Sequence, residues 1–144
     1  MIQENKELLL KDLCARLPYG VKIELSWLEM GKWTYIDTTL EADFIEDLIN
    51  DENGDIEIKP YLRPMSSMTE EEFTKLKEYG RLKHDQLGLT SFQNGAYKCL
   101  DFYLSEVPSG AVIRVFDWLN KYYFDYRDLI QMGLAIDATG LNIY

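Results

Sequence analysis

The segment 56–73, IEIKPYLRPMSSMTEEEF, constrains the fold most, because its pattern changes from that of a strand to that of a helix. Ile56 and Ile58 alternate with polar residues, which is the period of a strand with one buried face. Pro60 and Pro64 cannot donate backbone hydrogen bonds, so we expect the strand to end or lie at a sheet edge here.

The second half of this segment predicts a helix with a fixed start. Thr69 and Glu72 have the spacing of a capping box, and Met68 and Phe73 occupy the N′ and N4 positions, whose side chains form the contact called a hydrophobic staple. Glutamates in the first turn suit the positive end of the helix dipole. We therefore interpret the whole segment as a strand-to-helix junction that contains no recognisable catalytic group.

The N-terminal part predicts a helix followed by a hairpin. Gln3–Leu17 carries an apolar stripe at helical spacing, and a proline and a glycine follow it. The stripe comprises Leu9, Leu10, Leu13, Cys14 and Leu17. Cys14 is accordingly expected to be buried. Strands are predicted over Val21–Trp27, by its alternation, and over 32–38, by its β-forming residues, with a turn near Gly31.

Two readings fit residues 38–50, and we favour a short helix over a strand. Its apolar residues have helical spacing, and Thr38 with Glu41 has the spacing of a capping box. Asn53-Gly54 then predicts a tight hairpin turn. Strand 56–62 follows.

The C-terminal half is less regular. We predict a loop over 81–95, a strand rather than a helix over 96–104, and a helix opened by Pro108 and Ser109. Further on, we expect a short helix over 126–132, capped by Asp125 and closed by Gly133, and an extended piece over 134–138. The apolar stripe of the helix after Ser109 comprises Val112, Val115, Phe116, Leu119, Tyr122 and Tyr123.

These elements together predict a single α+β domain over 1–144. A small antiparallel sheet would pack against helices that lie mainly in the N- and C-terminal parts. The length of 144 residues suits one domain, and 47% apolar residues are enough for a core.

Charge narrows the classes of partner. The chain has 15 basic and 25 acidic residues, a formal charge of −10, so phosphate backbones and anionic membranes repel it. This argues against direct nucleic-acid binding. The sequence has no apolar run of the roughly 20 residues that span a bilayer, and its start does not match a secretory signal. We therefore expect a cytoplasmic protein that does not enter membranes. Its two cysteines, Cys14 and Cys99, are then expected to be reduced.

The acidic residues are concentrated in one stretch. Residues 33–58 contain nine acids and no lysine or arginine. Two interpretations stay open: a solvated face that keeps the protein in solution, or an acidic surface for a basic partner. The candidate partner-binding residues are Glu41, Asp43, Glu46, Asp47, Asp51 and Glu52.

Catalytic and metal-binding patterns are sparse. Asp51, Asn53 and Asp55 match the start of a calcium loop, but Ile56 replaces its glycine and Leu62 its final glutamate. His84 is the only histidine, and no nucleophile elbow or phosphate-binding loop occurs. We therefore expect no metal, no cofactor and no catalytic residue, and we lean away from an enzyme.

One compact group favours an alternative function. Arginine beside aromatic rings suits an anionic, planar ligand. Tyr61, Arg63, Tyr126 and Arg127 would line such a pocket, in a small-molecule or nucleotide-binding domain that could be enzymatic. The competing interpretation of YFDYRDLI is ordinary aromatic packing between two helices.

Three phrases, LLLKDLCARLPYGV, KPYLRPMSSMTEEE and DYRDLIQMGLAIDA, resemble an uncharacterised family of small proteins encoded by gut Bacteroidetes, often in phage-like or mobile regions. The resemblance brings no known activity. It implies a non-enzymatic interaction module that binds a host or phage protein, and it leaves the oligomeric state open. Asp128 departs from the family pattern, which more often has glycine there.

Overall fold

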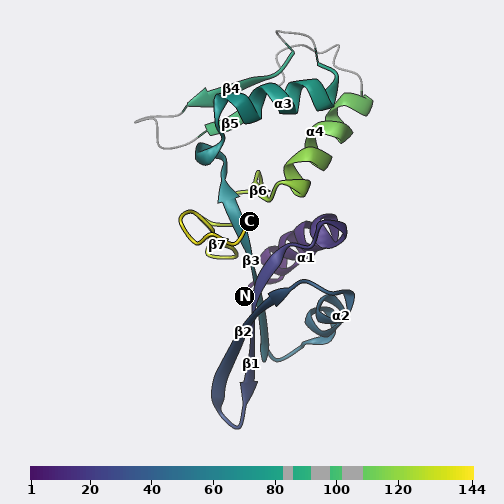
Figure 1. Cartoon of the computed structure of the whole chain (residues 1–144). Coiled ribbons are helices and arrows are strands. Elements are labelled where there is room, and N and C mark those ends of the chain that lie inside the picture. The colour runs from purple at the N-terminus through teal and green to yellow at the C-terminus, as the bar shows by residue number, and fades with distance from the viewer. Residues whose placement is uncertain (83–85, 92–97, 102–108) are drawn as a thin grey trace. The chain divides into compact units, whose positions relative to one another are not determined.

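The structure is a computed structural model that describes residues 1–82, 86–91, 98–101 and 109–144 (Figure 1). It confirms the α+β class, with four α-helices and a small mixed sheet among the described residues. The chain forms two compact units. Unit 1 comprises Met1–Leu62 and Arg127–Tyr144, and unit 2 comprises Arg63–Tyr126.

Unit 1 holds the main sheet. Strand β1 pairs antiparallel with β2, which confirms the predicted hairpin, and it also pairs antiparallel with β3, whereas β7 runs parallel to β3. The sheet is therefore mixed rather than purely antiparallel. The elements are α1 (Gln3–Arg16), the 3-10 turn η1 (Leu17–Tyr19), β1 (Lys22–Glu29), β2 (Lys32–Thr39), α2 (Ala42–Asn50), β3 (Ile56–Pro64, whose last two residues belong to unit 2) and β7 (Ile136–Asp137).

Alternation along β1 and β3 separates the two faces of this sheet. Ile23 and Ile58 lie on one face and are fully buried, whereas Lys22 and Lys59 lie on the other and stay partly exposed. Residues two apart point to the same face of a strand, so the sequence pattern is sufficient for this arrangement. The buried apolar residues of α1 and α2 complete the core, namely Leu9, Leu13, Ile45 and Leu48.

Helix α1 confirms the predicted helix but buries a different face. The predicted stripe included Cys14, and that thiol is exposed. The buried positions are Leu9, Asp12, Leu13 and Arg16, so an acid and a base occupy half of the inner face. The prediction was wrong because it assigned the inner face from apolar residues alone.

Helix α2 confirms the favoured helix over the strand, but not its predicted start. Its N-cap is Glu41, which makes no side-chain cap, and Thr38 belongs to β2. The capping box was therefore wrong. The Asn53-Gly54 turn is present, with Gly54 at φ +72°, but it joins a helix to a strand and is not a hairpin turn.

Unit 2 begins with the last two residues of β3, Arg63 and Pro64. The Thr69–Glu72 capping box is confirmed, because each side chain accepts a hydrogen bond from the backbone N–H of the other. The two residues of β6 run parallel to the last two residues of β3. The elements that follow β3 are η2 (Met65–Ser67), α3 (Glu70–Gly80), β4 (Gly88–Ser91), β5 (Lys98–Asp101), α4 (Ser109–Lys121) and β6 (Phe124–Asp125).

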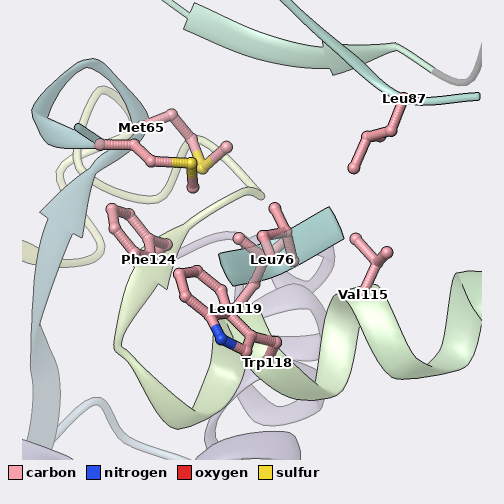
Figure 2. Close-up of a cluster of buried hydrophobic side chains, with 8 residues drawn as sticks. Met65, Leu76, Leu87, Val115, Trp118, Leu119 and Phe124 are labelled. Atoms are coloured by element: carbon pink, nitrogen blue, oxygen red, sulfur yellow. The ribbon is translucent and has the colours of Figure 1, made fainter. Parts of the chain in front are cut away.

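A cluster of buried apolar side chains holds unit 2 together (Figure 2). Phe73, at the predicted staple position, packs against this cluster. Trp118 stacks on Phe124, with ring centroids 5.8 Å apart. The cluster consists of Met65, Met68, Leu76, Leu87, Val115, Trp118, Leu119 and Phe124.

The middle of the chain contains a small two-stranded sheet. The predicted loop 81–95 was wrong at Gly88–Ser91, because these residues form β4 and pair antiparallel with β5. Strand β5 confirms the predicted strand at Lys98–Asp101. The rest of the predicted strand 96–104, together with His84 and Pro108, lies outside the described residues.

The predicted helix over 126–132 is absent from the described residues, which form turns there. Asp125 belongs to β6, and Asp128 takes φ +61°, which interrupts a helical path. Glycine adopts this left-handed conformation most readily, so an aspartate at this position carries a conformational cost. Gly133 has φ +75° but ends a turn and not a helix, and β7 confirms the extended piece at Ile136–Asp137.

Among the described helices, none combines the length and the apolar character needed to cross a bilayer.

Candidate interaction surface

The acidic residues chosen from the sequence lie on and around α2. Five of them are exposed, and none forms an ion pair with a described residue. These are Glu41, Asp43, Glu46, Asp47 and Glu52. We call these five residues the α2 acids.

Asp51 differs from the other acidic candidates because it stabilises the turn. Its carboxylate accepts hydrogen bonds from the backbone N–H of Asp55 at 3.1 Å and of Ile56 at 3.2 Å. Lys6 in turn donates to the carbonyl of Asp51 at 2.8 Å. Asp51 therefore fixes the start of β3.

The net charge is distributed very unevenly between the two units. Unit 1 contains seven lysines and arginines against sixteen acids, a formal charge of −9, whereas unit 2 contains eight against nine. The acidity of the protein is therefore almost entirely a property of unit 1.

The hairpin of β1 and β2 exposes large apolar side chains that the sequence analysis did not single out. Trp33 is 52% exposed, Tyr35 67% and Met30, at the turn, 99%. Ile36 and Leu28 are also exposed. Figure 1 shows the hairpin extending beyond α2 to its turn. The signal was in the sequence, because apolar residues at 33, 35 and 36 cannot all lie on one face of a strand.

Strand β2 forms an edge of the sheet among the described residues. It pairs with β1 through all eight of its residues, from Lys32 to Thr39, and with no other described strand. Proteins commonly protect such edges with prolines, bulges or very short strands. Strand β2 has a continuous register and no proline. It therefore offers a regular edge for further pairing.

A groove of about 770 Å³ also belongs to unit 1. Its lining combines apolar side chains, among them Trp33 and Ile49, with the carboxylates of Asp51, Glu52 and Glu57. The groove therefore brings an exposed aromatic residue of the hairpin together with the acidic end of α2. This arrangement suits a segment that carries both basic and apolar side chains.

Tyr61, one of the predicted ligand residues, lines a second cavity of unit 1. The cavity measures about 470 Å³ and also contains Lys22, Asp37 and Thr39. The Tyr61 hydroxyl donates to Asp37 at 2.7 Å. Burial, and then this hydrogen bond, raises the pKa of the Tyr61 phenol above its ordinary value, so the hydroxyl stays protonated.

Arg63 and Tyr126 belong to unit 2 and have partners inside it. The Arg63 guanidinium donates to both carboxylate oxygens of Glu72, at 2.6 and 2.9 Å, and lies 4.2 Å from the ring centroid of Phe124. Tyr126 donates to Asn120 at 2.8 Å. Arg63 thus joins the end of β3 to the start of α3.

Arg127 belongs to a charge cluster of unit 1. Its Nε atom lies 3.3 Å from Asp12 Oδ1, and the other Asp12 oxygen accepts from Arg16 Nε at 2.8 Å. The side chains of Asp12 and Arg16 are fully buried. This contact connects the turn after β6 to the inner face of α1, over a sequence separation that no local pattern reveals.

The four predicted ligand residues therefore fall into two pairs, Tyr61 with Arg127 in unit 1 and Arg63 with Tyr126 in unit 2. Each has an internal partner, and a small-molecule or nucleotide site on them stays a prediction. Over the part of the chain that the structure describes, no cluster of histidine, cysteine, aspartate and glutamate could hold a metal ion.

Comparisons with protein-family models, with curated proteins and with solved structures found no match to this chain.

Proposed function

We propose that this chain is a cytoplasmic, non-enzymatic protein-interaction module whose unit 1 binds a basic partner, a host or phage protein as the family resemblance implies. One observation carries the proposal: the formal charge of −9 in unit 1 includes the α2 acids, which are exposed and form no ion pair with a described residue. A concentrated field of one sign raises the rate of encounter with an oppositely charged partner.

Exposed apolar groups lie in the same unit and supply a second requirement of a binding surface. Charge complementarity contributes mainly to encounter and specificity, whereas buried aromatic anchors contribute most of the affinity. Trp33 and Tyr35 are half or more exposed, and Trp33 lines the groove that also contains Glu52. Unit 1 therefore combines both kinds of group.

Charge reversal on α2 tests the proposal. The probe is a fluorescently labelled lysine-rich peptide, and the measurement is its dissociation constant from fluorescence anisotropy at low salt. Asp43→Lys with Glu46→Lys should weaken binding by about tenfold or more, because two attractive charges become repulsive. Raising the salt concentration should weaken binding to the native protein, because exposed charges are screened.

A matched control is available on α3 of unit 2. Glu71→Lys with Glu78→Lys changes the net charge equally and, like the test pair, includes one acid of a helix's first turn. We expect the control to change the dissociation constant by less than about threefold, since unit 2 has almost no net charge. Equal weakening by the two pairs would contradict a surface located on α2.

A further inference from the structure

We infer that the partner binds as an extended basic segment that adds a strand to the edge of β2 along which no described strand pairs. The inference rests on the proposed function and specifies its mode of recognition. In this mode, main-chain hydrogen bonds contribute affinity and alternate side chains contribute specificity.

The turn of the hairpin determines which backbone groups of β2 face outward. Met30 and Gly31 have φ +50° and +77°, and the flanking pair is Glu29 with Lys32. In such a two-residue hairpin, the flanking pair exchanges both hydrogen bonds, and every second pair after it does the same. The N–H and C=O groups of Trp33, Tyr35 and Asp37 therefore point away from β1.

The side chains at this edge are suited to a strand partner. Trp33 and Tyr35 lie on one face of the sheet and Ile36 lies on the other, and all three are exposed. Cross-strand pairs between aromatic or β-branched residues stabilise strand pairing by roughly 0.2–1 kcal/mol each. An added strand would meet apolar groups on both of its faces, so its side chains need not alternate strictly between apolar and charged.

Charge decides which occupant the edge suits. Residues 33–58 contain nine acids and no lysine or arginine, and unit 1 as a whole has a formal charge of −9. A second copy of this chain would bring the same negative charge to the edge. A segment rich in lysine or arginine would be attracted instead, and its backbone would satisfy the outward groups of β2.

Amide hydrogen exchange on the native protein provides the direct test. The probe is a peptide of about ten residues that alternates lysine with valine, long enough to pair along the strand. In its presence, exchange at the N–H groups of Trp33, Tyr35 and Asp37 should slow by about tenfold or more, because they become hydrogen-bonded. Exchange at Thr34 and Ile36, whose N–H groups already bond to β1, should change little.

Two changes isolate the backbone contribution. Tyr35→Pro removes an outward N–H without breaking a bond to β1, and Tyr35→Ala removes the same side chain but keeps the N–H. Tyr35→Pro should weaken peptide binding by about tenfold relative to Tyr35→Ala, with an unchanged circular dichroism spectrum. A peptide N-methylated at alternate residues should likewise bind about tenfold more weakly to the native protein, because it loses backbone N–H donors.

The outcomes separate this inference from the proposed function. Binding that depends on the α2 acids but leaves exchange at Trp33 and Tyr35 unchanged would overturn strand addition and leave the proposed function intact. Failure of the peptide to bind at low salt would overturn both. Protection of β2 without peptide, rising with protein concentration and with a doubled mass in sedimentation, would assign the edge to a second copy and overturn the basic occupant.

Discussion

Met30 combines two unfavourable properties at one position. It has φ +50°, which residues with a side chain rarely adopt, and its side chain is 99% exposed. Asparagine tolerates positive φ, so Met30→Asn should raise the free energy of unfolding by about 1 kcal/mol in a urea titration. Met30→Ala keeps the conformational cost and should give no gain. A lower stability for Met30→Asn would show that the exposed methionine makes a stabilising contact.

Asp12 is the residue whose removal should destabilise unit 1 most through charge. Its carboxylate lies between Arg16 and Arg127, and both Asp12 and Arg16 are fully buried. Asp12→Ala removes the carboxylate that pairs with the buried guanidinium of Arg16, and it should lower the free energy of unfolding by about 3–5 kcal/mol.

Glu7, an exposed acid of the same helix, provides the control for Asp12. Glu7→Ala should change the free energy of unfolding by less than about 0.5 kcal/mol in the same chemical denaturation experiment. A loss below about 1 kcal/mol for Asp12→Ala would mean that the cluster contributes little to stability.

At the scale of elements, the stability contributed by the first turn of α3 should depend on pH, because it contains Glu72. The hydrogen bond from Arg63, followed by that from the backbone N–H of Thr69, lowers the pKa of Glu72, and burial opposes this only in part. A lowered folded-state pKa stabilises the protein above the unfolded value of 4.5. That stability is lost as the pH falls through the folded-state pKa.

Glu72→Gln removes this titration. The variant should be less stable than the native protein at neutral pH, but its free energy of unfolding should fall less steeply as the pH falls below 4.5. Glu71→Gln, at an exposed neighbouring position, should follow the native curve. Parallel curves for Glu72→Gln and the native protein would show that Glu72 has the same pKa in the folded and unfolded states.

The elements also show where sequence patterns are sufficient. The alternation in β1 and β3 and the Thr69–Glu72 capping box are local, and the structure confirms them. The composition of the inner face of α1 is not set by local patterns alone. Asp12 and Arg16 pair with each other across one turn of the helix, but the third member of the cluster, Arg127, is distant in the sequence, and no periodicity within α1 reveals it.

The candidate surface was also predictable only in part, because some of its features depend on local patterns and others on contacts between distant segments. The sequence predicts a helix that carries Asp43, Glu46 and Asp47, and these acids are exposed on α2, with Glu41 and Glu52 exposed just outside its ends, since charged residues avoid burial unless paired. The sequence already implies that Trp33, Tyr35 and Ile36 cannot all lie on one face of a strand, whereas the edge position of β2 is a property of the sheet order. Strand order depends on contacts between distant segments, so β-forming residues at 32–38 indicated a strand and gave no sign of its free side.

At the scale of the whole molecule, strand β3 connects the two compact units. Its residues up to Leu62 pair with β1 and β7 of unit 1, whereas Arg63 and Pro64 pair with β6 of unit 2. Because one continuous strand pairs in both units, we expect the loss of its pairing in one unit to weaken its pairing in the other. We therefore expect the chain to unfold as one cooperative domain, as the sequence predicts.

Tryptophan fluorescence can test this cooperativity. With Trp27→Phe and Trp33→Phe, the only remaining tryptophan is Trp118 of unit 2. Adding Asp12→Ala, which destabilises unit 1, should lower the urea midpoint of Trp118 fluorescence as much as that of far-ultraviolet circular dichroism, because all parts of a two-state domain unfold together. If the Trp118 midpoint stays constant while circular dichroism reveals an earlier transition, the units unfold independently, and β3 does not couple their stabilities.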